Sequence, residues 1–218
     1  MHDALATAQR SEDGAGDDLS PSAKGVRRLR SIALGFLAAA APDEAASFAK
    51  TQFDRADNMT DRQGALMTLV SLDAPERQAA LDAFYERFRD DPLVLDKWFS
   101  LQAAAQRADT VDRVAELARH PDFTMANPNR LRSLVGQFAA NHWAFHHPSG
   151  RGYDFVSDMI LAADAINPQA AARLVPPFGR WRRFEPKRAQ LMRGALEKIV
   201  AKPGLSKDVF EQASKSLA

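Results

Sequence analysis

Side chains that cap helices, each followed directly by proline, recur along this chain and limit what it can fold into. Such pairs occur at Ser20-Pro21, Asp91-Pro92, Asn127-Pro128 and Asn167-Pro168. The capping side chain accepts a hydrogen bond from an unpaired backbone N–H of the first helical turn, and proline suits the next position because it has no N–H to leave unpaired. Each pair therefore predicts the start of a helix.

The spacing of apolar residues between these starts also predicts helices. Residues at helical spacing occur before Pro42, after Pro92 and after Pro128: Val26, Leu29, Ile32, Ala33 and Phe36; then Leu93, Val94, Trp98, Phe99 and Leu101; then Leu131, Leu134, Val135 and Phe138. The second set is expected in the core, with Asp96 and Lys97 pointing outward. Further starts are predicted by capping-box patterns at Thr60-x-x-Gln63 and Asp73-x-x-Glu76, and by Thr110 and Ser206.

The fold class that follows is all-α, with about eleven short helices and no strand, since no stretch alternates with a period of two. Short connections make consecutive helices antiparallel neighbours, and such pairs stack into a two-layer superhelix of the HEAT or armadillo type. Residues 1–19 are small and polar and are predicted to be a flexible lead-in. Residues 20–218 are predicted to form a single helical domain.

Charge and composition exclude several classes of protein. Lys and Arg total 29 and Asp and Glu total 28, so the net charge of +1 gives no global field that attracts nucleic acid or an anionic membrane. The chain has no cysteine, which excludes disulfides, a thiol nucleophile and Cys-ligated zinc. No apolar run approaches the ~20 residues that span a bilayer, and no signal-peptide pattern is found. We expect a cytoplasmic protein whose partners include neither nucleic acid nor membrane.

Four segments of the chain resemble the C-terminal domain of the bacterial aminopeptidase N family, which are M1-class zinc exopeptidases. The clearest is Phe-Thr-Met-Ala-Asn-Pro-Asn-Arg-Leu-Arg-Ser at 123–133. The other three, in the same order as in the family, are 52–53 with 56–61, then 96–99, then 167–169 with 172–174. The resemblance runs from about Val26 to the C-terminus, and it independently implies a helical superhelix.

The resemblance also implies that the catalytic apparatus is missing from this chain. The family binds zinc through His-Glu-x-x-His and a later glutamate, and it holds the substrate's amino terminus with Gly-Ala-Met-Glu-Asn; neither motif occurs. The pair His142 and His146 has Trp143 in place of the glutamate, and Ala165 where the third ligand would follow. The turn-forming residues 147–150 predict that the helix ends before His146 can face the same way as His142. We expect no catalytic residue, no metal ligand and no cofactor here, with zinc confined to the parent's catalytic domain.

Arg130, Arg132 and Arg173 lie in the matched segments and are candidates for contact with substrate. In the family this domain closes over the catalytic domain and walls a large cavity, so at least one of the three is expected to face it and meet the carboxylate of a bound peptide. The alternative is an internal salt bridge with Asp122, Asp164 or a similar acid. Arg130 falls in the first turn of a helix, where the dipole repels cations, and therefore needs a partner or solvent.

The densest basic run, Arg180 to Arg188, contains Trp181 and Phe184. One interpretation is phosphate contact with bases stacked on the aromatic rings. The other, favoured by the near-zero net charge, is a loop whose aromatic rings enter the core while its arginines stay in water. The arginines at 27, 28 and 30 are likewise expected on a solvated helix face.

Together these features predict a non-catalytic C-terminal domain of an M1 zinc aminopeptidase, which removes N-terminal amino acids from peptides. The domain would pack against the parent's catalytic domain, wall the active-site cavity and touch the peptide substrate by contact only; alone it is expected to be inactive. The alternatives are a free-standing helical-repeat adaptor that binds a peptide or protein in its concave face, and a weak nucleic-acid binder. An exposed apolar patch, left by a severed interface, would favour the domain over the adaptor.

Overall fold

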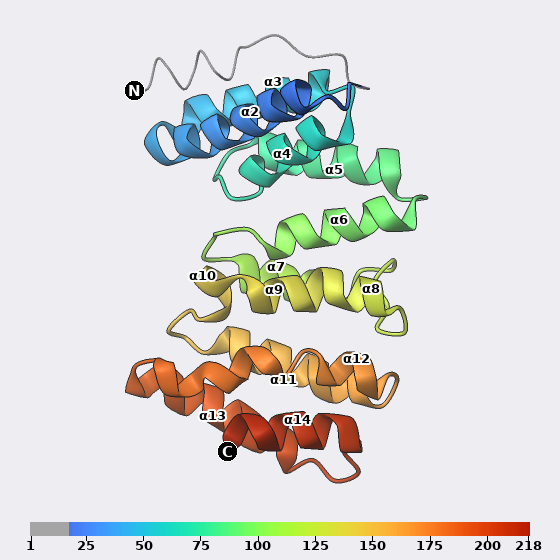
Figure 1. Ribbon diagram of the computed structural model, residues 1–218, viewed down its shortest axis with the longest axis vertical. Helices are drawn as coiled ribbons and strands as arrows, with labels where there is room; N and C mark the ends of the chain where they lie inside the picture. The colour runs from blue at the N-terminus through green and yellow to red at the C-terminus, as the bar shows by residue number, and fades with distance from the viewer. Residues whose placement is uncertain (1–17) are drawn as a thin grey trace. The chain divides into compact units, whose positions relative to one another are not determined.

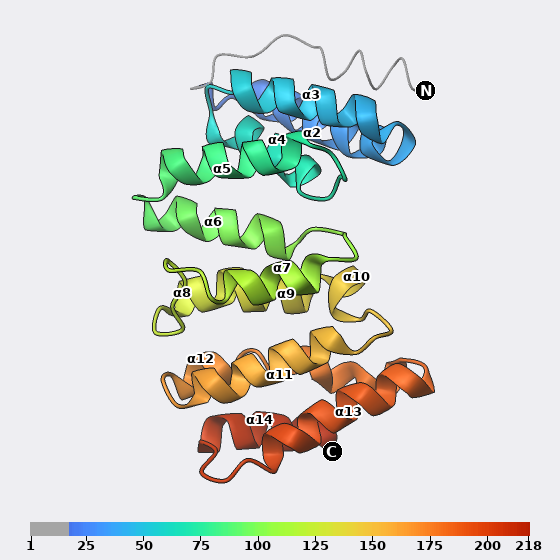
Figure 2. The same cartoon turned by 180° about the vertical axis from the view of Figure 1, so that it is seen from behind.

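A computed structural model describes residues 18–218, whose regular elements are all helices, as the capping pairs and the spacing of apolar residues predict (Figures 1 and 2). In chain order they are α2 (Pro21–Ala40), α3 (Pro42–Arg55), α4 (Met59–Leu69), α5 (Glu76–Phe88), α6 (Pro92–Ala103), α7 (Thr110–Leu117), α8 (Pro128–Leu131), the π-helix η1 (Arg132–Gly136), α9 (Gln137–Ala140), α10 (His142–Phe145), α11 (Arg151–Asp164), α12 (Pro168–Ala172), the 3₁₀-helix η2 (Pro176–Arg183), α13 (Pro186–Val200) and α14 (Lys207–Leu217). Within residues 18–218 no helix is both long enough and apolar enough to cross a membrane. The lead-in predicted for residues 1–19 lies outside the described residues, apart from Asp18 and Leu19.

Most helices begin where the sequence predicts. The side chains of Ser20, Asn127, Asn167 and Ser206 each accept a hydrogen bond from a backbone N–H in the first turn of the helix that follows. A helix also begins at Pro92. These starts were predictable because a cap and its proline act within one turn and need no distant partner.

Three of the predicted caps are wrong. Asn58, two residues before the expected Thr60, caps α4 and accepts a hydrogen bond from the N–H of Asp61. The N-cap of α5 is Pro75, which makes no side-chain cap bond. Thr110 is the first residue of α7, and its hydroxyl donates to the carbonyl of Ala105 at 2.9 Å instead of capping the helix.

The described residues form two compact units, one up to Asp91 (unit 1) and one from Pro92 to Ala218 (unit 2). In unit 1, α3 packs against α2 and α4, and α5 packs against α3 and α4. Buried polar groups join these helices. The carboxylate of Asp61 accepts hydrogen bonds from Arg30 at 3.2 Å and Asn58 at 2.9 Å, while Gln52 donates to the backbone carbonyl of Asp61 at 2.8 Å. Pairing offsets part of the cost of removing these charges from water.

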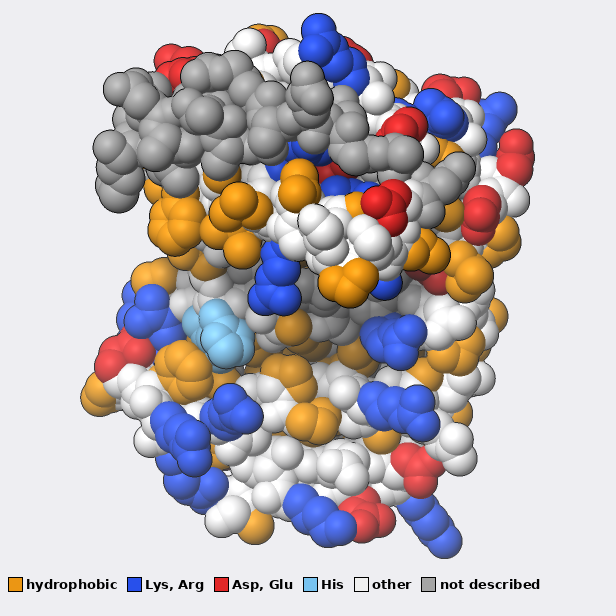
Figure 3. Space-filling view, turned by 45° about the horizontal axis from the view of Figure 1, so that its top comes forward, with side chains coloured by type: hydrophobic (Ala, Val, Ile, Leu, Met, Phe, Trp, Pro, Cys, Tyr) orange, Lys and Arg blue, Asp and Glu red, His pale blue; other side chains and the backbone are white. Residues whose placement is uncertain are grey.

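The orientation of α2 differs from the prediction. Arg27 and Arg30, expected on a solvated face, are buried, and Arg30 forms the ion pair with Asp61. Leu29, Ile32 and Phe36 are 56, 45 and 63% exposed; we call these three residues the α2 stripe. In Figure 3, apolar side chains (orange) gather over the part of the surface where α2 lies. The acid on α4 decides which face of α2 turns inward.

In unit 2 successive helices alternate in direction and form two layers. Helices α7, α11 and α13 lie behind α9 and α12 in Figure 1 and in front of them in Figure 2. Fully buried aromatic rings fill the space between the layers; Phe145 meets Phe138, Tyr153 and Phe178 edge to face, with ring centroids 6.3, 5.1 and 5.3 Å away. The two-layer antiparallel arrangement predicted from the short connections is confirmed within this unit. Through Phe138 on α9, this packing holds the helical segment that begins at Pro128.

Candidate functional site

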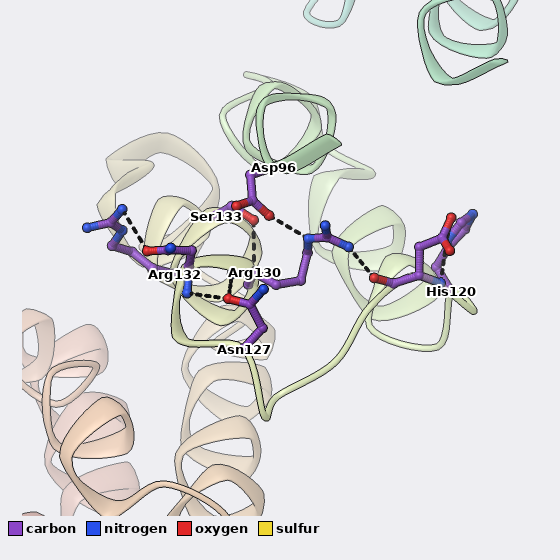
Figure 4. A network of polar contacts seen from close by, with 8 residues as sticks. Asp96, His120, Asn127, Arg130, Arg132 and Ser133 are labelled. Carbon is purple, nitrogen blue, oxygen red and sulfur yellow. Dashed lines mark hydrogen bonds and ion pairs between the residues drawn. The ribbon is translucent and has the colours of Figure 1, made fainter. Parts of the chain in front are cut away.

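Three consecutive elements, α8, η1 and α9, form one continuous helical segment from Pro128 to Ala140. Asn127 begins it, accepting hydrogen bonds from the N–H groups of Asn129 and Arg130 at 2.9 and 3.3 Å (Figure 4). In the middle of the segment the carbonyl of Arg132 accepts from the N–H of Gln137, five residues later, which is the spacing of a π-turn. π-turns inside α-helices are rare overall, and those that occur often lie at functional sites, so this segment is a candidate for one.

Arg130 lies inside unit 2 and is only 6% exposed. Its Nε donates to the carboxylate of Asp96 on α6, and its Nη1 donates to the backbone carbonyl of Asp122 (Figure 4). The guanidinium carbon lies 5.0 Å from the centre of the Phe99 ring, which adds a cation–π contact. Arg130 therefore connects three parts of the unit: its own helix α8, helix α6, and the loop that follows α7. The acid that pairs with it is Asp96 rather than Asp122 or Asp164.

Asp96 was expected to point outward, and this expectation is wrong. Its side chain is 16% exposed and turned toward Arg130. Leu93, expected in the core, is instead exposed, whereas Trp98, Phe99 and Leu101 are buried as predicted. Both partners of the Arg130–Asp96 pair lie in segments that carry the family resemblance, which is the one signal in the sequence that could have suggested the pairing.

Arg132 and Arg173 lie at the surface of unit 2. Arg132 donates to the side-chain oxygen of Asn129 at 3.3 Å, and among residues 18–218 neither arginine forms an ion pair. A Cβ placed on Gly136 would lie 3.2 Å from Cγ of Arg132 and 3.7 Å from Cδ2 of Leu174. The stem of Arg132 and the residue after Arg173 therefore border the same spot, although the two arginines are 41 positions apart in a chain of 218 residues.

A pocket of about 250 Å³ adjoins Arg173. It lies between α12 and α14 and is lined by Gln169, Ala172, Arg173, Asp208, Glu211 and Gln212. The carboxylate of Glu211 also pairs with Lys215, which lowers its pKa through the hydrogen bond and the attraction of the ammonium group. Cationic and anionic side chains on one pocket wall can bind a zwitterion or a peptide end, because a guanidinium forms two parallel hydrogen bonds with a carboxylate.

The histidines at 142 and 146 pack against each other, and His146 also packs against aromatic side chains of unit 2. Helix α10 ends at Phe145, as the turn residues predict, and the two imidazole rings have centroids 5.7 Å apart. His146 shares a hydrogen bond of 2.9 Å between its Nδ1 and the hydroxyl of Tyr153, and its ring lies 4.2 Å from that of Phe184. Burial, together with the charges of nearby cations, lowers the pKa of His146 to about 4, so the ring is neutral at pH 7. Within 18–218 no group of three or more potential ligands could hold a metal ion.

One interpretation made the basic run from Arg180 to Arg188 a loop, and this is wrong. The helix η2 extends to Arg183, and α13 begins at Pro186. The indole N–H of Trp181 donates to the carbonyl of Ser216 at 3.0 Å, and the guanidinium of Arg182 lies 4.1 Å from the Trp181 ring centre. Phe184 stacks on His146. Both aromatic rings are therefore engaged within unit 2.

Comparison with known proteins places the chain in a family. A family model described as a domain of unknown function (DUF3458_C) with ARM repeats matches residues 1–218. The aminopeptidase N of Caulobacter vibrioides is 48% identical over 197 residues, 90% of this chain and 23% of the relative, and that of Escherichia coli is 41% identical over 193 residues, 88% and 22%. A crystal structure of Legionella pneumophila aminopeptidase A in complex with aspartic acid matches with a TM-score of 0.88 at 33% identity, covering 99% of this chain and 26% of that one.

The chain thus spans about a quarter of the length of the relatives it matches. The resemblance inferred from four short segments is confirmed over nearly the whole chain, and the ARM-repeat description agrees with the helical-repeat fold predicted from the capping pattern. The chain belongs to the DUF3458_C family of ARM-repeat domains and is a homologue of the C-terminal domain of aminopeptidase N.

Proposed function

We propose that the chain acts as the non-catalytic C-terminal domain of an M1 zinc aminopeptidase, walling the active-site cavity and restricting the access of peptides to it. The observation that carries the proposal is the 48% identity to an aminopeptidase N, which extends over 90% of this chain but only 23% of that enzyme. A match of this kind is what one domain of a larger enzyme gives. In this proposal the partner is the catalytic domain, and the zinc ion and its ligands belong to that domain.

Within the domain, we assign contact with substrate to Arg132 and Arg173 rather than to Arg130. The first two are exposed, and Leu174, the neighbour of Arg173, borders the same glycine as the stem of Arg132, so both guanidinium groups are available to a peptide carboxylate. Arg130 is buried and already bound to Asp96, and it fixes the start of the segment that carries Arg132. The polar pocket beside Arg173 would accommodate the downstream part of a short peptide.

The apolar surface of unit 1 favours this proposal over the free-standing adaptor. The α2 stripe exposes three large apolar side chains in a row. A protein that functions alone in water rarely leaves such a row uncovered, whereas a domain taken from a larger enzyme exposes part of its former interface. Nucleic-acid binding is less favoured, because the aromatic rings of the basic run are engaged within unit 2.

The test is a chimeric enzyme in which this chain replaces the region that it matches in E. coli aminopeptidase N. We expect the chimera to hydrolyse aminoacyl p-nitroanilides, while the chain alone does not. In the chimera, Arg132→Ala with Arg173→Ala should raise KM several-fold for short peptides with a free C-terminal carboxylate. The same peptides with an amidated C-terminus are the matched control, because they lack the charge that the arginines would bind.

One result would count against the proposed domain and two against the assignment of the arginines. A folded chimera without aminopeptidase activity would show that the chain cannot serve as this domain. Equal KM changes for peptide acids and peptide amides would show that the two arginines do not meet the carboxylate, and an unchanged KM for both would remove them from the substrate path.

A further inference from the structure

Helix α2 has two apolar faces, and only one of them is covered. Ala33, Leu34 and Leu37 are buried against the rest of unit 1. Leu29, Ile32 and Phe36, the α2 stripe, follow one another three and four positions apart and so share a second face. Helices that are apolar on more than one side normally lie between two neighbours. The stripe therefore has the composition of a buried face without a neighbour in the described structure.

The stripe also continues toward the start of the helix. A Cβ placed on Gly25, four positions before Leu29, would meet nothing within 4 Å, so the backbone is open to close approach there. Lys24 and Arg28, both exposed, run along one edge of the stripe. A surface that is apolar along its centre and basic along one edge fits an amphipathic helix with carboxylates on the matching edge.

The last helix of the chain offers a comparison within the same fold. The outward residues of α14 include Lys207, Asp208, Glu211 and Lys215, and Phe210 is its single exposed large apolar residue. In repeat proteins the terminal helices carry a polar outer face, while interior helices are apolar where the next repeat stacks. By this criterion α14 has the surface of a terminal helix and α2 has the surface of an interior one.

We propose that the α2 stripe is the docking face for an amphipathic helix from the remainder of an aminopeptidase N, which continues the ARM-repeat array beyond α2. This inference rests on the proposed function. It draws on the match to an ARM-repeat family and on relatives about four times longer than the chain. A docked helix would cover Leu29, Ile32 and Phe36 and place its carboxylates beside Lys24 and Arg28.

The natural sequence has no cysteine, so one introduced thiol can report on coverage of the stripe. Ile32→Cys, at a position 45% exposed, is compared with Phe210→Cys on α14, at a position 50% exposed, in the isolated chain and in the chimera with E. coli aminopeptidase N. The reaction of each thiol with a maleimide is followed by peptide mass spectrometry. We expect the thiol at 32 to react about tenfold or more slowly in the chimera than in the isolated chain, and the thiol at 210 to react equally in both.

Each other outcome overturns the docking proposal. Equal reactivity of the thiol at 32 in both proteins means that nothing docks there. Slow reaction already in the isolated monomer, relieved by deleting residues 1–17, assigns the stripe to that segment, and protection that grows with concentration assigns it to a second copy. Activity of the same chimera separates the two proposals, since an active enzyme with an unprotected thiol retains the function and rejects the docking face.

Discussion

Replacing Arg130 by methionine should destabilise unit 2 while leaving its helices in place. Methionine keeps most of the buried volume but removes the donors to Asp96 and to the carbonyl of Asp122. Breaking a fully buried ion pair costs about 3–5 kcal/mol, because one charge is left without its partner in a medium of low dielectric constant. Water reaches the 16% exposed side chain of Asp96 and relieves part of that cost, so we expect a loss of about 2–3 kcal/mol.

The assay is urea unfolding followed by tryptophan fluorescence. All three tryptophans, Trp98, Trp143 and Trp181, belong to unit 2, so the signal reports on this unit. With an m value of about 2 kcal/mol/M, the midpoint should fall by about 1–1.5 M urea. The matched control is Arg132→Met, which removes an exposed arginine two positions away and should change the free energy of unfolding by less than about 0.5 kcal/mol.

A double-mutant cycle shows whether the pair itself is responsible. Asp96→Asn should also destabilise unit 2, and the double variant with Arg130→Met should cost less than the sum of the two single changes. Reasoning from the ion pair would be refuted if Arg130→Met were as stable as Arg132→Met. Strict additivity of Arg130→Met and Asp96→Asn would likewise show that the two side chains act separately.

Two further predictions concern the same unit. Gly152→Ala should destabilise it by about 2 kcal/mol or more, because a Cβ there would lie 2.6 Å from the backbone oxygen of Phe145. The control is Gly194→Ala in α13, where a Cβ meets nothing within 4 Å and the change should stabilise the unit by about 0.5–1 kcal/mol. Thermal melts compare the two variants, and equal effects would contradict the close contact at Gly152. The pKa of His146 is lowered from 6.5 to about 4 in the folded state, so the unfolded chain takes up this proton first as the pH falls. The contribution of the neutral ring to the free energy of unfolding is therefore fully present above about pH 6.5 and is lost progressively down to about pH 4. The half-buried ring keeps this to about 1–2 kcal/mol, and His146→Phe should flatten that part of the curve of unfolding free energy against pH; an unchanged slope would show that another group titrates there.

Local signals predicted most of the helix starts, and at one of the three wrong caps two local signals compete. Asn127 and Asn167 cap their helices as expected because the cap, the proline and the first turn are neighbours in sequence. At the start of α4, Thr60 fitted the capping-box pattern, but Asn58 caps the helix and also binds the carboxylate of Asp61. The bond from Asn58 to Asp61 spans only three residues, but the same carboxylate is also held by Arg30, 31 residues away, and that contact lies outside any short window of sequence.

Helical periodicity identified the faces of α2 but not which of them is covered. Arg30 is buried because Asp61, 31 residues away, supplies its partner. Once that pair is inside, the α2 stripe must turn outward. Both apolar faces of α2 can be identified in the sequence, but a contact between distant helices determines which of them is buried. The π-turn at 132–136 is a similar case, since the segment Arg-Ser-Leu-Val-Gly has no local feature that separates it from an ordinary helical turn.

The geometry of a helix bears directly on how variants of the two neighbouring arginines should be interpreted. Residues two positions apart point to different sides of a helix, so Arg130 and Arg132 cannot both face a cavity while one of them is buried. The buried one, Arg130, has a carboxylate partner, and its loss would destabilise the unit that carries Arg132. Loss of activity in a chimera that carries an Arg130 variant would therefore report first on the folding of unit 2. Only Arg132 and Arg173, whose removal should leave the fold intact, can report on contact with a substrate.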